Sequence, residues 1–162
     1  MNDLILGLSG VEWAYLGAAL AVIGGGMGSA MGITSISNTA TGILSEDSEK
    51  YGKILPLAAM PGTQGIYGFI TALLVFIFFG FFGGGAELTA HQGVQVFLAC
   101  MPVTVLCFVS AIYQGATAVG AAGMVARREE DAGKALIFPA LVETYAVFSL
   151  IVTILMLLFI AG

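Results

Sequence analysis

Long runs of apolar residues alternate with short polar segments along this chain. Each run is longer than the roughly 20 residues that an α-helix needs to cross a bilayer; the four runs are Val11–Leu44, Lys53–Phe82, Val94–Val125 and Ala135–Ile160. The even alternation typical of barrel strands is absent, and lipid cannot pair the exposed backbone groups of an open structure. The pattern predicts an all-α integral membrane protein with four transmembrane helices.

Three polar connections separate these runs, at Ser45–Gly52, Gly83–Gln92 and Arg127–Gly133. All basic residues fall in or beside the first and third connections; they are Lys50, Lys53, Arg127, Arg128 and Lys134. Because basic loops stay on the cytoplasmic side of a membrane, we expect residues 45–53 and 126–134 to be cytoplasmic and both termini to lie outside.

The composition agrees with a membrane location. The chain is 59% hydrophobic and 9% charged, whereas a soluble domain carries about 25% charged residues. The glycine run Gly24–Gly28 lacks the Lys-Ser/Thr ending of a phosphate-binding loop. We therefore expect no catalytic activity of its own, no cofactor and no nucleic-acid partner.

The two halves of the chain resemble each other. A shift of 81 residues without a gap pairs Glu49 with Glu130, Lys53 with Lys134 and Thr63 with Thr144. We interpret the chain as one membrane domain, residues 1–162, containing a duplicated helical hairpin at residues 11–82 and 92–162. Because each half holds two spans, the two copies are parallel, a geometry from which rings are built.

Glu143 is the candidate for chemistry. It lies nine residues beyond Lys134, which is about 13 Å into the membrane at the rise of an α-helix. An ionised carboxylate at that depth is costly unless it is protonated or paired, and no basic residue is available there. We expect its partner to be a proton or a bound cation. The alternative is a permanently protonated glutamic acid that joins helices by a hydrogen bond. In the repeat alignment Gly62 takes its place, so the carboxylate occurs in one hairpin.

Several oxygen-bearing side chains are expected at the depth of Glu143. They are Thr63, Gln64, Tyr67, Gln114, Thr144 and Tyr145. Sodium is a hard cation that needs several oxygens in place of its water, whereas a proton needs the carboxylate alone. These neighbours therefore favour sodium, and a purely structural polar cluster remains the alternative. Pro61 interrupts the second helix and could free a carbonyl near Met60 for the ion, or could only kink the helix.

Small residues recur along the first and third helices. Gly24, Gly28 and Gly32 are spaced by four residues, and the third helix carries Gly115, Gly120 and Gly123. Small faces let membrane helices approach closely. We expect the first and third helices to form an inner circle, while the second and fourth face lipid.

Two segments carry a specific resemblance. At Met60–Phe69 (MPGTQGIYGF) and Leu141–Ala146 (LVETYA), the chain resembles the K subunits, also called proteolipid or c subunits, of bacterial V-type sodium ATPases. The resemblance extends over nearly the whole chain. It implies a rotor ring of identical subunits in a bacterial cell membrane, turned by ATP hydrolysis in a soluble head, with one sodium ion carried by each subunit.

The resemblance also implies a set of ion ligands and partners. The ligands are the backbone carbonyl of Met60 and the side chains of Thr63, Gln64, Gln114 and Glu143, with Tyr67 as a supporting hydrogen-bond partner. The partners are identical subunits, lipid, a membrane stator subunit with an arginine, and a central-stalk subunit. Proton-carrying relatives typically lack the two glutamines, so Gln64 and Gln114 carry the sodium assignment.

Three other functions remain open at this point, and the third is a purely structural or channel-forming proteolipid. The first is the same rotor carrying protons. The second is a small multidrug exporter, which also has four helices and one essential glutamate but carries that glutamate in the first helix and has no duplicated hairpin.

Overall fold

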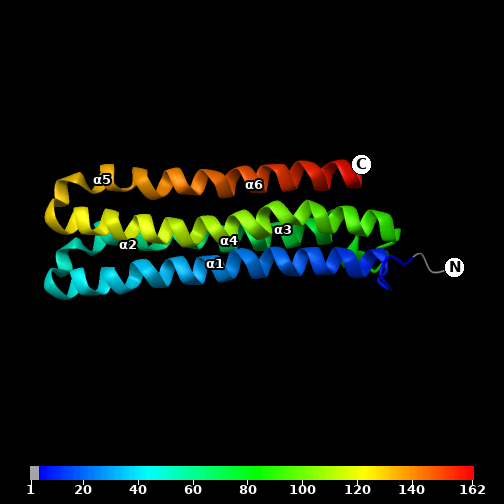
Figure 1. Ribbon diagram of the computed structural model, residues 1–162, viewed down its shortest axis with the longest axis horizontal. Coiled ribbons are helices and arrows are strands. Elements are labelled where there is room, and N and C mark those ends of the chain that lie inside the picture. The colour runs from blue at the N-terminus through cyan, green and yellow to red at the C-terminus, as the bar shows by residue number, and fades with distance from the viewer. Residues whose placement is uncertain (1–3) are drawn as a thin grey trace.

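The computed structural model describes residues 4–162 and is an elongated bundle of helices (Figure 1). Four helical segments of 31 to 38 residues are long and apolar enough to cross a membrane. The elements in chain order are α1 (Gly10–Glu46), η1 (Ser48–Lys50), α2 (Tyr51–Ala59), η2 (Met60–Gly62), α3 (Thr63–Phe78), η3 (Phe81–Gly83), α4 (Ala90–Arg127), η4 (Glu129–Asp131), α5 (Ala132–Ala135) and α6 (Ile137–Ala161), where η denotes a 3-10 helix. The prediction of an all-α membrane protein is confirmed.

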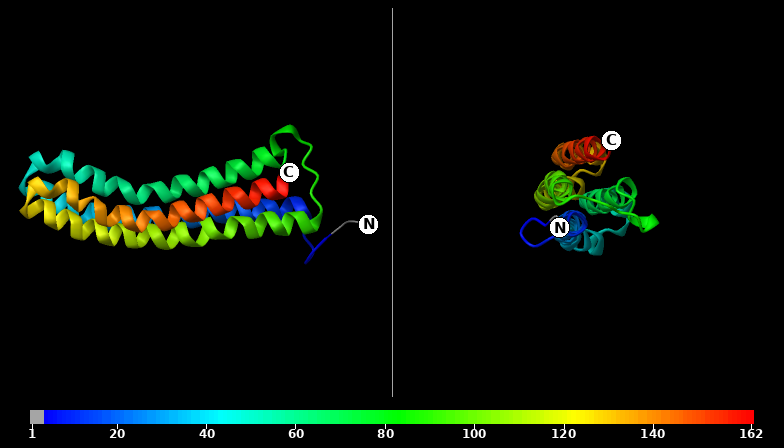
Figure 2. Two further views of the ribbon diagram at one scale, coloured as in Figure 1. Left: turned by 90° about the horizontal axis from the view of Figure 1, so that it is seen from above. Right: turned by 90° about the vertical axis from the view of Figure 1, so that its right-hand side faces the viewer.

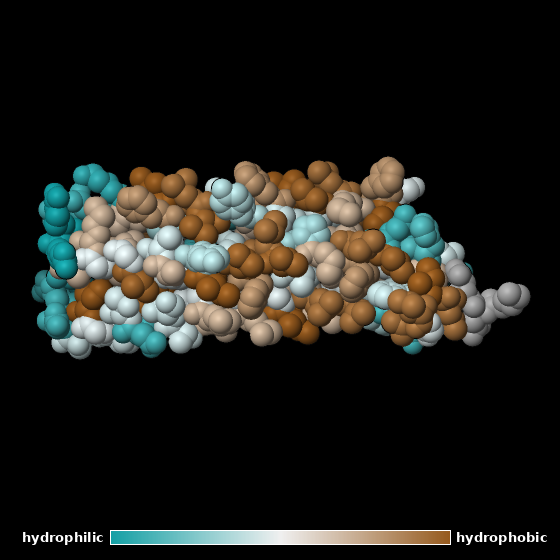
Figure 3. All heavy atoms as spheres, in the orientation of Figure 1, coloured by the Kyte–Doolittle hydropathy of each residue, from teal (hydrophilic) through white to brown (hydrophobic). Residues whose placement is uncertain are grey.

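The helices pack as two hairpins that run in the same direction. α1, α4 and α6 lie in a row and α3 packs beside it, as the end-on view of Figure 2 shows. α1 and α4 make the most extensive contact, while α3 also touches α4 and α6. The α1–η1 and α4–η4 connections meet at one end of the bundle, and hydrophilic residues gather at this end in Figure 3. α3 and α6, which carry Gln64 and Glu143, therefore both pack against α4.

The backbone repeats between the two hairpins. Asp47 and Arg128, at positions related by the sequence repeat, are the breaks between long helices, with φ and ψ of −148° and 96° in one and −143° and 84° in the other. Each break is followed by a 3-10 turn, η1 or η4. The expected connections Ser45–Gly52 and Arg127–Gly133 are thus shorter than predicted, because helical backbone resumes after one residue.

Both long helices α1 and α4 begin earlier than the hydrophobic pattern predicts. Ser9 and Glu12 form a capping box, in which the Ser9 hydroxyl accepts from the Glu12 amide and the Glu12 carboxylate accepts from the Ser9 amide. Thr89 and Gln92 form the same arrangement before α4. In a sequence, a capping box is recognised as Ser or Thr followed three residues later by Glu or Gln. These polar pairs mark the helix starts, which the apolar pattern alone does not locate.

The second span ends at Phe78, four residues before the predicted end at Phe82. Gly80 has a φ of +73°, a left-handed conformation that terminates the helix and that glycine adopts without steric cost. The apolar residues that follow, Phe81 and Phe82, belong to the turn η3. Phe81 packs against Tyr15 of α1 with ring centroids 4.8 Å apart. Apolar character here reflects packing at the bundle end and not continuation of the helix.

Glycines set the close approach of α1 and α4. A Cβ atom on Gly28 would lie 2.6 Å from the Phe108 carbonyl oxygen, and Gly24 and Gly32 meet the α4 backbone in the same way. On α4, a Cβ atom on Gly115 would lie 2.6 Å from the Cα of Gly32. The prediction of a close small-residue contact is confirmed for these positions. It is wrong for Gly120 and Gly123, where an added Cβ would meet nothing within 4 Å.

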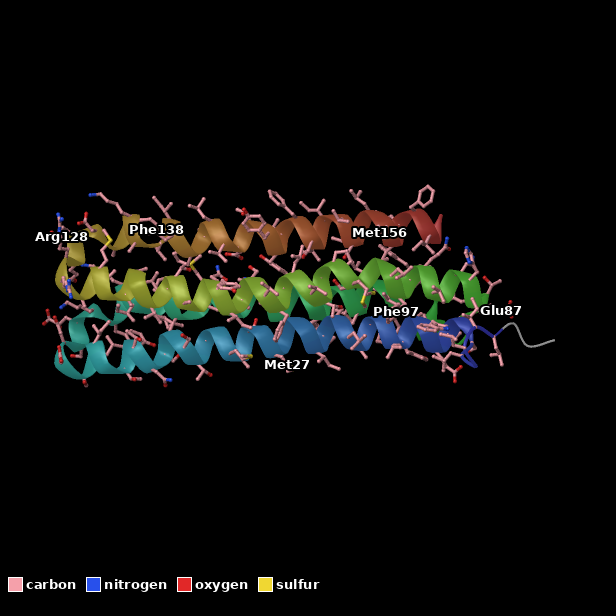
Figure 4. All side chains as sticks on the ribbon, in the orientation of Figure 1. Met27, Glu87, Phe97, Arg128, Phe138 and Met156 are labelled. Atoms are coloured by element: carbon pink, nitrogen blue, oxygen red, sulfur yellow. The ribbon has the colours of Figure 1, made fainter. Side chains whose placement is uncertain are left out.

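An ion pair joins the first and third connections at the charged end of the bundle. Lys53, beside the first connection, pairs with Glu129 of the third. Asp131 is 3% exposed and accepts a hydrogen bond from Lys134 at 2.6 Å, with Arg128 at 3.0 Å. The Lys134 hydrogen bond and the neighbouring positive charges hold the pKa of Asp131 below its ordinary value. Figure 4 shows Arg128 at this end and Glu87 at the opposite end.

We predict that Gly28→Ala destabilises the bundle, because the added methyl group must displace the α4 backbone. The expected loss is about 1–3 kcal/mol in the free energy of unfolding, measured by denaturant titration in detergent. Gly42→Ala is the matched control on α1, since a Cβ there meets nothing within 4 Å. Equal stability of the two variants would contradict the close contact.

Candidate ion-binding site

The second span is interrupted beside the candidate site. η2, at Met60–Gly62, replaces one α-helical turn by a 3-10 turn, so that the Thr63 amide bonds to the Met60 carbonyl three residues earlier. Pro61 within this turn has no amide hydrogen to donate, which prevents regular helix pairing there. Its ring packs against α1 at Gly32, where an added Cβ would lie 2.8 Å from the Pro61 Cβ. The break therefore fixes where Thr63 and Gln64 enter α3.

Glu143 of α6 is half-buried and is directed at α3 and α4. The Tyr67 hydroxyl of α3 donates to its Oε1 at 2.9 Å, and the Gln114 side-chain amide of α4 donates to its Oε2 at 3.2 Å. Each carboxylate oxygen therefore has a donor from a different helix. Both donors are neutral groups, so neither supplies a positive charge to balance an ionised carboxylate.

Two fully buried glutamines continue the network inward from Glu143. Gln64 and Gln114 are both 0% exposed. The Gln64 Nε2 donates to the Gln114 Oε1 at 2.6 Å, and the Gln114 Nε2 donates to the Pro139 carbonyl at 3.1 Å as well as to Glu143. A buried amide is expensive to leave unpaired. These contacts pair the amides and tie α3, α4 and α6 together.

Thr63 and Met60 complete the cluster on the α3 side. The Thr63 hydroxyl lies 3.0 Å from the Met60 carbonyl oxygen and 3.3 Å from the Gln64 Oε1. Hydrogen bonds therefore link all six residues expected in or beside the site: Met60, Thr63, Gln64, Tyr67, Gln114 and Glu143. The structure brings them into one network, and their role as ion ligands stays a prediction.

Two further neighbours expected from sequence depth do not join this network. Thr144 is exposed and its hydroxyl donates to the Leu141 carbonyl of its own helix at 2.7 Å. Tyr145 is 61% exposed and packs edge-on against Phe148, with ring centroids 6.4 Å apart. Both residues are next to Glu143 in sequence, but they point to other sides of α6.

The sequence interpretation missed three groups that contact the network. Ser110 of α4 accepts from the Gln64 Nε2 at 3.3 Å and donates to the Val142 carbonyl at 3.0 Å. The third is the Pro139 carbonyl. Ser110 could have been found from its position four residues before Gln114, which places both side chains on one face of the helix. The Val142 and Pro139 carbonyls could not have been found from the sequence, because every residue has a backbone carbonyl.

The repeat yields one such network per chain. Gly62 occupies the position related to Glu143, and Ile33 occupies the position related to Gln114. A Cβ on Gly62 would lie 3.4 Å from the Ile33 Cδ1. The related place in the first hairpin is therefore lined by a methyl group and not by an amide, and it offers no charge for a cation to balance.

Glu143 also reaches the surface of the bundle. A surface hollow on α6 is lined by Ala140, Glu143, Thr144, Val147 and Phe148. Apart from the carboxylate and one hydroxyl, this lining is apolar. The carboxylate is thus bonded to a buried amide on one side and accessible from the surface of the bundle on the other.

Comparison with known proteins gives three concordant findings. A family model that describes the C subunit of ATP synthase matches residues 16–75 and again residues 97–156. The chain is 35% identical over 158 residues to the V-type sodium ATPase subunit K of Enterococcus hirae, with 98% of each protein covered. It is also 35% identical over 157 residues to the A-type ATP synthase subunit K of Methanocaldococcus jannaschii, covering 97% of this chain and 64% of that protein.

We predict that Gln114→Leu destabilises the bundle, because Glu143 loses a donor and the Gln64 amide loses its shortest acceptor. The expected loss is about 1–3 kcal/mol in the free energy of unfolding, measured by denaturant titration in detergent. Gln95→Leu, at an exposed position of the same helix, is the control. If both variants matched the parent protein, the buried network would carry no stability.

Proposed function

The chain belongs to the family of ATP synthase C subunits, and from this premise we propose that it is the ion-carrying rotor subunit of a V-type ATPase and moves sodium ions at Glu143. Proteins of this family form membrane rings and do not themselves hydrolyse ATP. The chain is an integral membrane protein of four helical spans. In the proposed assembly, ATP hydrolysis in a soluble head turns the ring.

The network around Glu143 is the observation that carries the proposal. It places one carboxylate next to two buried amides, a hydroxyl and a carbonyl at a helix break. These are the oxygen types that hard cations prefer. We assign as sodium ligands the carbonyl of Met60 and the side chains of Thr63, Gln64, Gln114 and Glu143, with Tyr67 holding the carboxylate.

Sodium is preferred over a proton for two reasons. The relative from Enterococcus hirae is named as a sodium ATPase subunit. In addition, a proton carrier needs only the carboxylate in an apolar pocket, whereas this chain keeps both glutamines fully buried among the packed helices. A proton-carrying rotor remains the second candidate and is separated from the first by the labelling experiment below.

Charge balance gives the transport cycle. Sodium neutralises Glu143, so the loaded subunit passes through lipid, while the emptied carboxylate requires a positive partner. The structure places no Lys or Arg of residues 4–162 in contact with Glu143. We propose that an arginine of a membrane stator subunit approaches through the surface hollow beside Glu143. Moving each charge against 100 mV costs about 2.3 kcal/mol, which ATP hydrolysis supplies through a central-stalk subunit.

The placement in the membrane follows from the distribution of basic residues. We propose that the charged end of the bundle, residues 45–53 and 126–134, is cytoplasmic and receives the stalk, with both termini outside. The membrane proposed is the bacterial cell membrane. The halves 11–82 and 92–162 are proposed as the repeating hairpins. A small multidrug exporter is incompatible with the family membership and with a glutamate in the fourth span.

The first prediction from this proposal concerns labelling of Glu143. A carbodiimide reacts with the protonated carboxyl group, so bound sodium should protect it. At a sodium concentration about ten times the dissociation constant, labelling should slow about tenfold relative to potassium at equal ionic strength. Mass spectrometry of the labelled peptide gives the rate. Labelling that responds to pH alone, with no effect of sodium, would reject sodium and leave the proton rotor.

The second prediction concerns transport. Glu143→Gln removes the charge that binds and releases the ion, so ATP-driven sodium uptake into vesicles containing the whole complex should be lost. Glu87→Gln is the control, because Glu87 lies in the connection between η3 and α4 at one end of the bundle. Uptake retained by Glu143→Gln would rule out a carboxylate-based rotor and leave a structural proteolipid.

A further inference from the structure

Ser110 lies at the centre of the helix contacts that support the ion site, although it is not among the proposed ligands. It is on α4, one turn before Gln114, and is 5% exposed. Its hydroxyl contacts α3 through the Gln64 side chain and α6 through the Val142 carbonyl, at 3.3 Å and 3.0 Å. One small side chain therefore joins three helices directly beside the two glutamines.

The hydrogen count at Ser110 supports one orientation of the Gln64 amide, whose nitrogen also donates to the Gln114 Oε1 at 2.6 Å. A hydroxyl has one hydrogen to donate, and a backbone carbonyl can only accept. The hydrogen of Ser110 is directed to the Val142 carbonyl. Towards Gln64, the hydroxyl can then only accept, so it selects the amide nitrogen and leaves the Gln64 Oε1 on the side of Thr63.

Gln114 is oriented by the same principle. Its Nε2 faces the Pro139 carbonyl at 3.1 Å and the Glu143 Oε2 at 3.2 Å, neither of which donates when Glu143 is ionised. Its Oε1 therefore faces Gln64. Two backbone carbonyls of α6, one acting through Ser110 and one directly, set both amide orientations.

The repeat supplies a second serine with a different contact. Ser29 of α1 occupies the position related to Ser110 and is 6% exposed. Its hydroxyl accepts from the Gly65 backbone amide of α3 at 2.8 Å. Ser29 thus binds the backbone next to Gln64, while Ser110 binds the Gln64 side chain. The related serines of the two hairpins hold the same segment of α3.

We propose that Ser110 is a positioning residue for sodium: by accepting from the Gln64 amide nitrogen, it keeps the Gln64 oxygen directed to the cation. The inference rests on the proposed function, because it concerns the affinity of that same site. An amide that turns its nitrogen to a cation opposes binding. Proton binding depends on the carboxylate and is much less sensitive to this orientation.

Ser110→Ala tests the proposal in the assembled ring. The sodium concentration that halves carbodiimide labelling of Glu143 should rise about tenfold, the usual effect of losing one buried hydrogen bond. The pH at which labelling is half-maximal without sodium should stay nearly unchanged. Ser110→Thr keeps the hydroxyl and should recover most of the sodium affinity. Ser149→Ala is the matched control, since Ser149 is 1% exposed and donates to the Ala146 carbonyl outside the network.

Each outcome decides between distinct explanations. If sodium does not protect the parent ring from labelling, the proposed sodium transport is rejected, and the role of Ser110 is rejected with it. If sodium protects the parent and Ser110→Ala rings equally, Ser110 does not position Gln64. Equal shifts in the sodium and proton curves, or the same loss in Ser149→Ala, would indicate general loosening of the helices. If Ser110→Thr also binds sodium weakly, the loss of affinity comes from the changed side-chain volume, and the proposed role of the hydroxyl is overturned.

Discussion

The cost of placing one carboxylate among lipid-facing helices governs this structure. Glu143 cannot stay ionised at membrane depth without compensation, and α6 itself supplies no positive charge. The neighbouring helices provide hydroxyl and amide donors, Tyr67 and Gln114, one for each carboxylate oxygen. These dipoles reduce the cost but leave the charge unbalanced.

The glycines of α1 matter because they bring the site-bearing helix close enough. Gly25 lies directly against the Gln64 carbonyl, and Gly32 lies against both the Ala111 carbonyl and the Pro61 ring. With larger side chains at these positions, α3 and α4 would stand farther from α1, which would disturb the packing around the 2.6 Å contact between the two glutamine amides. The packing of small residues far from the carboxylate therefore sets the geometry beside it.

The two hairpins have similar backbones at their connections, but only one of them carries Glu143. The breaks at Asp47 and Arg128 have nearly the same dihedral angles, and the related threonines, Thr63 and Thr144, both donate to a carbonyl three residues earlier. The side chains differ where the ion would bind, with Gly62 in place of Glu143. Each chain therefore has one such carboxylate for its two hairpins.

The sequence by itself determined the four spans, the parallel repeat and the lone carboxylate, because apolar length, basic loops and an unpaired charge at depth are local properties of the chain. It also identified Gln64 and Gln114, since amides are rare and costly in such spans. The helix ends could not be predicted from apolar periodicity, because they are set by capping pairs and by the left-handed backbone of Gly80. Only the tertiary structure showed that Thr144 and Tyr145 lie outside the hydrogen-bond network of Glu143. It also showed that Ser110 and the Val142 and Pro139 carbonyls contact this network. Which face of a helix meets a neighbour, and which way an amide points, are decided by contacts between segments distant in sequence.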